Sequence, residues 1–242
     1  MSLALLAGAT LDGVKIHGIN AQGKSLAYGI IKRALIAIEF PTQSDFPSLE
    51  MIPMPHHRRI EGYAIVSEDG MLANASGIMP DQLKFEADQK FFERGLDGVD
   101  VVVHGRHSHE RQRRSDLRQR LILTRKVSAI ADDPSNKKAL FWNPAGASLE
   151  QAMAVLGVAD GSVGVIGGTD VFGLFLDRYD VFHLSRAPNV QLPGGRPVFP
   201  EVPTRTPEEV LVGYGLEAGP RQVLDALKGL TLVSWHRASN RD

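Results

Sequence analysis

The 242-residue sequence contains no cysteine, which excludes disulfide bridges, cysteine-ligated zinc and thiol catalysis. It also lacks an apolar run long enough to cross a bilayer, because the best candidate, residues 26–40, is interrupted by Lys32 and Arg33. Neither sign of charge is in excess: 27 Lys and Arg stand against 28 Asp and Glu. These absences predict a soluble, cytoplasmic protein with neither nucleic acid nor a membrane as its partner.

The N-terminal part differs in pattern from the rest of the chain. Apolar residues recur at helical spacing in residues 24–39, and the stripe ends before Pro41. Residues 41–59 contain four prolines and little periodicity, which is typical of a linker. We therefore predict an extension over residues 1–58 with one amphipathic helix, followed by a domain over residues 59–242. The apolar stripe favours a role in covering the sheet or in forming a homodimer.

From residue 60 onward, strand-like and helix-like segments alternate. Strands are expected at 60–66, 99–105, 120–125, 138–143, 162–168 and 180–187. Helices are expected at 81–96, 148–157 and 169–177, with a polar helix beginning near residue 107. Near the C-terminus, residues 209–215 and 230–238 favour antiparallel strands with a helix over 220–229 between them. The pattern predicts an α/β fold with a mostly parallel central sheet, flanking helices and an antiparallel C-terminal edge.

Three predicted strands end in residues suited to phosphate groups. Gly105, Arg106 and Ser108 follow the first, and Thr124 and Arg125 follow the second. The third runs into Gly167-Gly168 and directly into a helix. Ligands of open α/β sheets collect beyond the carboxyl ends of strands, where glycines allow close approach and free N–H groups favour anions. The combination predicts a dinucleotide site with an additional phosphate.

Seven stretches of the sequence, taken in order, resemble the dihydrofolate reductase-like superfamily. They are "SEDGMLANASG", "VVVHGRHSHE", "RLILTRK", "FWNPAGASLEQAMAVLG", "VGVIGGTDVFGLFL", "YDVFHLSRA" and "GGRPVFPEV". That superfamily includes dihydrofolate reductases and the reductase domain of riboflavin biosynthesis. The resemblance implies the same fold and NADPH as cofactor. It assigns the phosphates of NADPH to Gly105, Arg106, Ser108, Thr124 and Arg125, with Gly167, Gly168, Thr169 and Asp170 in the loop around the diphosphate. It places Ser185 at the substrate pocket.

On the substrate side the pattern departs from that of folate reductases. Aligning "MPDQL" on the usual "LPxDL" puts Gln82 at the place of the substrate-binding acid, whereas a shift of one residue restores Asp81. Asp81 is the first candidate for orienting the substrate or assisting protonation, unless it only caps the helix, and Asp69 is the second. Phe85 is assigned to the substrate side, with core packing as the alternative.

The predicted function is an NADPH-dependent reductase that transfers hydride to a C=N or C=O group of a pteridine or pyrimidine heterocycle. Two alternatives stay open. One is an aminopyrimidine reductase of the riboflavin-pathway type, because "SEDGMLANASG" resembles the start of such domains. The other is a nucleotide-binding homologue without turnover.

Two further motifs invite other functions. Residues 18–25, "GINAQGKS", match the phosphate-binding pattern of triphosphatases, but Lys15 and His17 are unlike the buried strand that should precede it. We interpret the match as a turn and helix N-cap, with an ATP-dependent enzyme as the rival. The histidines at 104, 107 and 109 do not share a helix face, and no metal site is predicted.

Overall fold

A computed structural model of the chain describes the backbone of residues 15–19, 25–31 and 34–39, and residues 58–107 and 115–238 with their side chains. The chain divides into two compact units, Met1–His56 and His57–Asp242. Among the described residues, no helix is both long enough and apolar enough to cross a lipid bilayer.

The first unit contains strands where a helix was predicted. β1 (Lys15–Ile19), β2 (Ser25–Ile31) and β3 (Ala34–Glu39) form an antiparallel sheet in the order β1-β2-β3, with Leu26 opposite Glu39 and Ile31 opposite Ala34. The predicted amphipathic helix over residues 24–39 is therefore wrong. The isoleucines of these two short runs favour extended backbone, and periodicity alone does not separate short apolar strands from a helix.

The same strands correct the interpretation of "GINAQGKS". Ile19 pairs with Ser25 across the antiparallel β1–β2 ladder, and residues 20–24 between them lie outside the described residues. A triphosphate-binding loop needs a helix that presents its N-terminus to the phosphates. Here Ser25 begins a strand, so neither that arrangement nor the predicted helix N-cap is formed.

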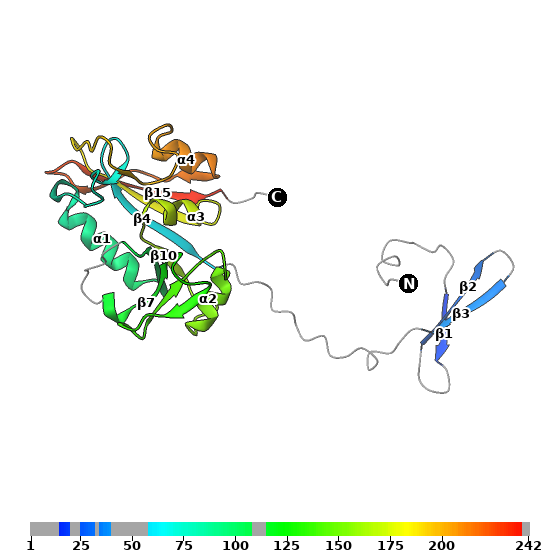
Figure 1. Ribbon diagram of the computed structural model, residues 1–242. Helices are drawn as coiled ribbons and strands as arrows, with labels where there is room; N and C mark the ends of the chain where they lie inside the picture. The colour runs from blue at the N-terminus through cyan, green and yellow to red at the C-terminus, as the bar shows by residue number, and fades with distance from the viewer. Residues whose placement is uncertain (1–14, 20–24, 32–33, 40–57, 108–114, 239–242) are drawn as a thin grey trace. The chain divides into compact units, whose positions relative to one another are not determined.

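The second unit is built on one large sheet, shown in Figure 1. Its strand order is β13-β15-β11-β4-β10-β6-β7-β9-β8, with β14 also paired to β15. The six central strands from β11 to β9 are parallel, and β8 and β15 flank them antiparallel. The bounds are β4 (Ile60–Val66), β6 (Val101–Gly105), β7 (Gln119–Leu123), β8 (Ile130–Asp132), β9 (Ala139–Trp142), β10 (Val163–Val165), β11 (Val181–Arg186), β13 (Leu216–Ala218), β14 (Gln222–Asp225) and β15 (Leu230–Arg237). The predicted mostly parallel sheet with an antiparallel C-terminal edge is confirmed.

Smaller elements complete this unit. β5 (Met71–Ala73) pairs with β12 (Arg196–Pro197) in a separate two-stranded sheet. The helices are α1 (Glu86–Asp97), α2 (Leu149–Val155), α3 (Thr169–Leu174) and α4 (Pro207–Gly213), with single 3-10 turns η2 (Asp81–Leu83) and η3 (Ser115–Leu117). Ser148 caps α2 as predicted, because its hydroxyl accepts from the N–H of Gln151 at 3.2 Å.

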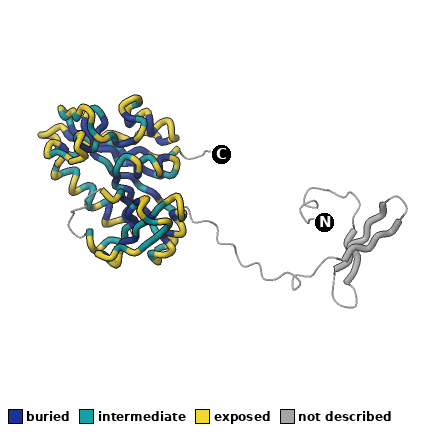
Figure 2. The backbone as a smooth tube through the Cα atoms, viewed as in Figure 1, coloured by how far each residue is buried: buried dark blue, intermediate teal, exposed yellow. Residues whose placement is uncertain are grey.

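Helices cover the two faces of the sheet unequally. Along β6, Val101 and Val103 belong to the main core cluster, whereas Val102 packs in a second cluster on the opposite face. Buried residues of α2, α3 and α4 join the main cluster, and Leu96 of α1 joins the second. Figure 2 shows the buried residues concentrated along the central strands. Of the helices that the structure describes, α1 alone contributes a buried residue to this second cluster.

The C-terminal prediction was partly wrong. Residues 209–215 were expected as a strand, but Pro207–Gly213 form α4, which begins at a capping box between Thr206 and Glu209. Residues 220–229 were expected as a helix, but they contain β14 and the turn into β15. The polar helix expected near residue 107 falls mostly on residues 108–114, which lie outside the described residues.

Candidate functional site

The three strand ends predicted to bind phosphate lie together at one edge of the sheet. β10, β6 and β7 are neighbours and parallel, so their carboxyl ends meet there. The N–H of Gly105 donates to the carbonyl of Gly167 at 2.8 Å, and the N–H of Arg106 donates to that of Leu123 at 3.1 Å. The segments after β6, β7 and β10 therefore form one continuous backbone surface.

Gly167 and Gly168 form the turn between β10 and α3. Gly167 has φ +109°, a conformation that favours glycine, and a Cβ there would lie 2.9 Å from the ring of Phe172. The Gly167–Gly168 peptide is cis. A Cβ built on Gly168 meets no atom within 4 Å, so this backbone faces open space. The turn can therefore admit a ligand close to the main chain.

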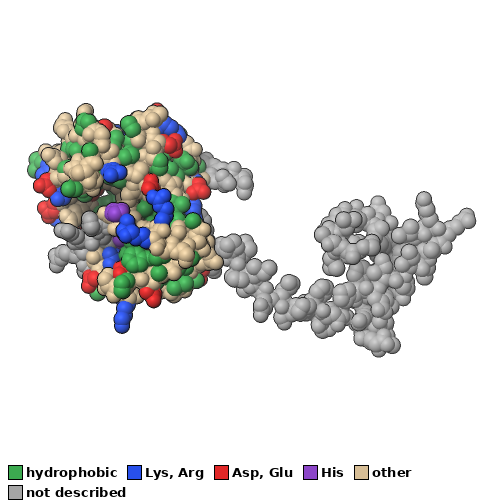
Figure 3. Space-filling model, viewed as in Figure 1, with side chains coloured by type: hydrophobic (Ala, Val, Ile, Leu, Met, Phe, Trp, Pro, Cys, Tyr) green, Lys and Arg blue, Asp and Glu red, His purple; other side chains and the backbone are tan. Residues whose placement is uncertain are grey.

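Side chains at the same edge supply positive charge. Arg106 and Arg125 are both exposed, and neither has a carboxylate partner among the residues that the structure describes. The Thr124 hydroxyl accepts from the N–H of Lys126 at 3.2 Å. On one face of this unit, Figure 3 shows lysine and arginine side chains beside histidine. Two guanidinium groups and a glycine backbone make a donor set that suits phosphate oxygens.

The positions of the remaining residues predicted for the cofactor add little to the evidence for a phosphate site. Thr169 donates its hydroxyl to the carbonyl of Pro197, which ties the start of α3 to β12. Asp170 is exposed in the first turn of α3. Ser108 lies outside the described residues.

The structure does not bring Asp81 to a buried position. Asp81 and Gln82 are both exposed in η2, and Asp81 forms an ion pair with Lys84 at 2.7 Å. The hydrogen bond from Lys84 lowers the pKa of Asp81. Its side chain caps no helix either, because Pro80 precedes η2 and Phe85 precedes α1. An exposed, ion-paired carboxylate offers little to a bound heterocycle.

Asp69 is occupied in holding a turn. Its carboxylate accepts from the Ser67 hydroxyl at 2.5 Å and from the N–H of Leu192 at 3.0 Å. These bonds connect the turn after β4 to the segment before β12. Asp69 therefore stabilises the conformation of that turn.

Asp88 is the acid that sequence reasoning missed. It lies partly buried in the first turn of α1, close enough to the buried Ser185 of β11 for the Ser185 hydroxyl to affect its pKa. Burial raises the pKa of Asp88 from 3.8 to about 6, although the Ser185 hydrogen bond opposes that change. A signal was present in the sequence: Asp88 precedes Phe91 and Phe92 by three and four residues, so an acid lies within the apolar stripe of this helix.

The neighbours of Asp88 explain how α1 is seated. Phe91 and Phe92 pack against the ring of Tyr63 at centroid distances of 6.3 and 6.0 Å. Gly95 lets the helix approach closely, since a Cβ there would lie 2.4 Å from that ring. Phe85, assigned to the substrate side with core packing as the alternative, is partly buried and packs beside a small cluster that includes Leu83 and Leu230.

Asp88 and the Gly167–Gly168 turn lie at the same end of the sheet. Ser185 is the penultimate residue of β11, opposite Ile65 of β4, and β4 separates β11 from β10 in the sheet. Both β11 and β10 run parallel to β4, so their carboxyl ends point the same way. Ser185 therefore lies two strands from the Gly167–Gly168 turn, and Arg106 and Arg125 follow the next two strands at the same end of the sheet.

Comparison with known proteins bears on this arrangement. Neither the comparison with protein-family models nor that with curated proteins finds a match to the sequence. Among solved structures, a protein from Shewanella sp. PV-4 named for riboflavin biosynthesis has a TM-score of 0.54 at 20% identity, over 74% of this chain and 99% of that one. A dihydrofolate reductase from Enterococcus faecalis, complexed with NADP(H) and RAB-propyl, has a TM-score of 0.52 at 20% identity, over 75% and 97%.

A third similar structure is a Thermotoga maritima diaminohydroxyphosphoribosylaminopyrimidine deaminase/5-amino-6-(5-phosphoribosylamino)uracil reductase. Its TM-score is 0.50 at 18% identity, over 75% of this chain and 57% of that chain. At such identities the likeness concerns the fold. The second unit therefore has the dihydrofolate reductase-like fold, which confirms the resemblance drawn from the sequence motifs.

Proposed function

We propose that the protein is an NADPH-dependent reductase that transfers hydride to a C=N or C=O group of a pteridine or pyrimidine heterocycle. One observation carries the proposal: Asp88 and Ser185 lie at the same end of the sheet as the Gly167–Gly168 turn, which is two strands away, and as Arg106 and Arg125, which follow the next two strands. A carboxyl group of raised pKa beside a dinucleotide edge is the arrangement that hydride transfer coupled to protonation requires.

The residues at the edge fit the cofactor. The backbone of Gly105, Gly167 and Gly168 would hold the diphosphate, and Arg106 and Arg125 would pair with the additional phosphate that distinguishes NADPH from NADH. When bound, the nicotinamide supplies the hydride. The protein's contribution is to hold the acceptor heterocycle against it in the correct orientation.

Asp88 replaces Asp81 as the proposed acid. With a pKa of about 6, its carboxyl exchanges a proton near neutral pH, so it can hold an N–H edge of the heterocycle and deliver a proton to the acceptor nitrogen. The neighbouring Ser185 hydroxyl favours the ionised form of this carboxyl, which opposes the effect of burial. Phe92 and Phe91, one turn along α1, provide an apolar surface beside it.

The test follows NADPH absorbance with dihydrofolate and, separately, with a ribosylaminopyrimidine as acceptor. Asp88→Asn should slow turnover by roughly 100-fold or more, because proton transfer from a positioned side chain contributes about that factor. NADPH affinity should stay the same. Asp81→Asn is the matched control and should retain activity, since Asp81 is exposed and paired with Lys84.

The two arms also separate the alternatives. Oxidation with the ribosylaminopyrimidine alone favours the riboflavin-pathway type of reaction. Tight NADPH binding without oxidation by either acceptor favours a nucleotide-binding protein without turnover. Equal activity of Asp88→Asn and the wild type would refute the role of Asp88.

A further inference from the structure

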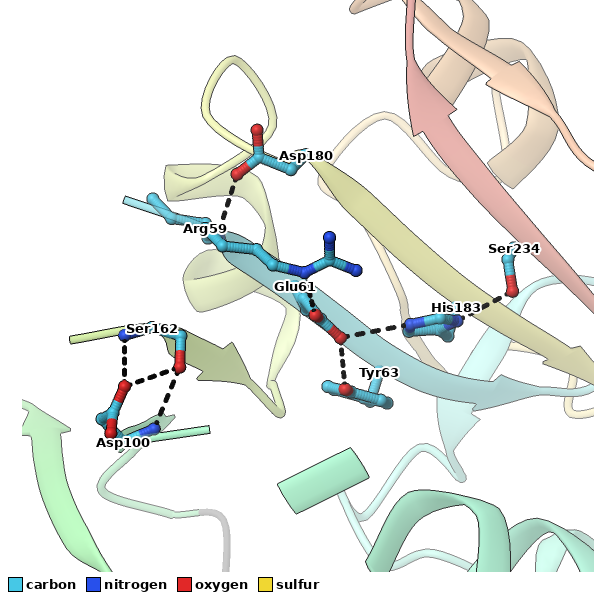
Figure 4. A network of polar contacts seen from close by, with 9 residues as sticks. Arg59, Glu61, Tyr63, Asp100, Ser162, Asp180, His183 and Ser234 are labelled. Atoms are coloured by element: carbon cyan, nitrogen blue, oxygen red, sulfur yellow. Dashed lines mark hydrogen bonds and ion pairs between the residues drawn. The ribbon is translucent and has the colours of Figure 1, made fainter. Parts of the chain in front are cut away.

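His183 lies on the same face of the sheet as Ser185, the neighbour of Asp88. It is two residues before Ser185 on β11, and side chains two apart on a strand point to the same face. Figure 4 shows its imidazole between Glu61 of β4 and Ser234 of β15. The Nε2–Glu61 Oε2 distance is 3.3 Å and the Nδ1–Ser234 Oγ distance is 2.9 Å. Both nitrogens of the ring are therefore engaged.

Hydrogen-bond directions fix the orientation of the ring. The hydrogen bond with His183 is the main cause that lowers the pKa of Glu61 to about 2, so Glu61 is a carboxylate and can only accept. Nε2–H therefore donates to Glu61, and Nδ1 is hydrogen-bonded to the Ser234 hydroxyl. Glu61 also accepts from the Tyr63 hydroxyl at 2.5 Å and from Arg59. A ring bonded at both nitrogens has one favoured orientation.

The fixed ring is in contact with α1. Its face stacks on Tyr63 with centroids 4.8 Å apart and an interplanar angle of 26°. The ring of Phe91 meets it edge-on at 5.2 Å and 70°. Phe91 is three residues after Asp88, so it lies on the same side of the helix. The imidazole therefore supports α1 one turn beyond the acid.

We propose that His183 is a positioning residue for Asp88: its hydrogen-bonded ring supports α1 through Phe91 and so sets how deeply the Asp88 carboxyl lies against the sheet. The titratable groups that face the ring are Glu61 and Tyr63 from β4, with Asp88 one helical turn from Phe91 on α1. Ser234 faces it from β15. The inference rests on the proposed function only in giving Asp88 a catalytic role.

The experiment measures the pKa of Asp88 by carbon NMR titration of the full chain, without substrate. In His183→Ala, α1 loses its support and the carboxyl gains water, so its pKa of about 6 should fall by about one unit toward the ordinary 3.8. His183→Phe keeps a flat ring between Tyr63 and Phe91, and the pKa should stay within about 0.3 units of the wild-type value. Rescue by this variant is a result that a general loss of stability does not give.

Two further variants keep the test decisive. Val165→Ala makes a cavity in the main core on the other face of the sheet, and should leave the pKa of Asp88 unchanged. If His183→Ala does not fold, Phe91→Ala, which removes the ring of α1 that His183 contacts, should lower that pKa instead. An unchanged pKa in folded His183→Ala would overturn the proposal, as would equal falls in His183→Phe or Val165→Ala.

Turnover is measured separately on the same variants. A fall in kcat for His183→Ala that tracks the pKa, with unchanged KM for NADPH, is expected. If the wild type oxidises no NADPH with either acceptor, the proposed function fails, but the titration still decides whether His183 positions Asp88.

Discussion

The two faces of the central sheet differ in what they bury. The face under α2, α3 and α4 buries a large apolar cluster in which aromatic rings such as Phe172, Phe175 and Phe182 interlock. The face under α1 places Glu61, His183 and Asp88 between smaller apolar groups. Buried charge is costly unless it is paired, whereas buried apolar area stabilises. In the proposed function, the apolar face would therefore supply stability and the α1 face would carry the chemistry.

The largest expected effect tests the apolar face. Phe175→Ala removes a ring that is 1% exposed and packs near Trp142 and Tyr179, so unfolding free energy should fall by about 3–5 kcal/mol. The adjacent Leu174 is 42% exposed, and Leu174→Ala should change it by no more than about 0.5 kcal/mol. Urea denaturation measures both. Similar losses for the two variants would remove the stabilising role of this face.

A somewhat smaller effect is expected from Glu61 on the α1 face. Its hydrogen bond with His183, aided by those from Tyr63 and Arg59, lowers its pKa from 4.5 to about 2. A lowered folded-state pKa contributes stability above pH 4.5 that is lost as the pH falls toward 2. Glu61→Gln should therefore cost about 2–3 kcal/mol at pH 7 and nearly nothing at pH 2.

Denaturation midpoints of the Glu61 variant and the wild type, measured across this pH range, check the prediction. Glu217→Gln, an exposed position on β13, is the control and should follow the wild type at every pH. A constant difference between Glu61→Gln and the wild type from pH 2 to 7 would show that the network stabilises by packing and not by charge.

The sequence predicted the central sheet better than it predicted the residues buried under α1. The continuous β-branched run of β6 and the glycines after β10 are local signals, and they were sufficient to predict the sheet and the glycine turn at its edge. The acid was missed because family alignment drew attention to Asp81, while burial of Asp88 depends on contacts with Ser185 from a strand far along the chain. Tertiary contacts of this kind leave only an indirect trace: an acid within an apolar helical stripe.

Errors in the secondary structure had similar causes. Residues 209–213 contain two β-favouring valines, but the Thr206–Glu209 capping box and Pro207 in the first turn favour a helix. Over residues 220–229 the apolar spacing favours a helix, yet Asp225 accepts from the N–H groups of Leu227 and Lys228 and forms a turn. In both places capping and turn side chains outweighed the apolar pattern.

The effect of Asp88 on stability should depend on pH in the opposite sense to that of Glu61, although both residues lie on the α1 face. Its folded-state pKa is raised from 3.8 to about 6, so the ionised form is disfavoured in the native protein, and stability falls as the pH rises from about 4 to 6. Asp88→Asn removes that penalty and should stabilise the protein by about 2 kcal/mol at pH 7, with no gain below pH 4.

The measurement is again urea denaturation, at pH 4 and pH 7. Gain of stability together with loss of turnover would mark Asp88 as a group retained for chemistry at a cost in stability. If Asp88→Asn destabilises the protein equally at both pH values, the carboxyl stabilises the fold. That result would contradict the proposed catalytic role of the α1 face.

The smallest effect concerns the edge where both faces meet. Arg125 is exposed and has no carboxylate partner among the described residues, so Arg125→Gln should leave stability within about 0.5 kcal/mol of the wild type. A guanidinium group that pairs with the 2′-phosphate adds about 1.4 kcal/mol to binding, so NADPH affinity should fall about tenfold while NADH affinity stays unchanged. Calorimetry with both coenzymes measures this, with Lys228→Gln, an exposed cation beside Phe85, as the control. Because stability and NADH binding serve as internal references, an equal loss for the two coenzymes would show that Arg125 does not contact the distinguishing phosphate.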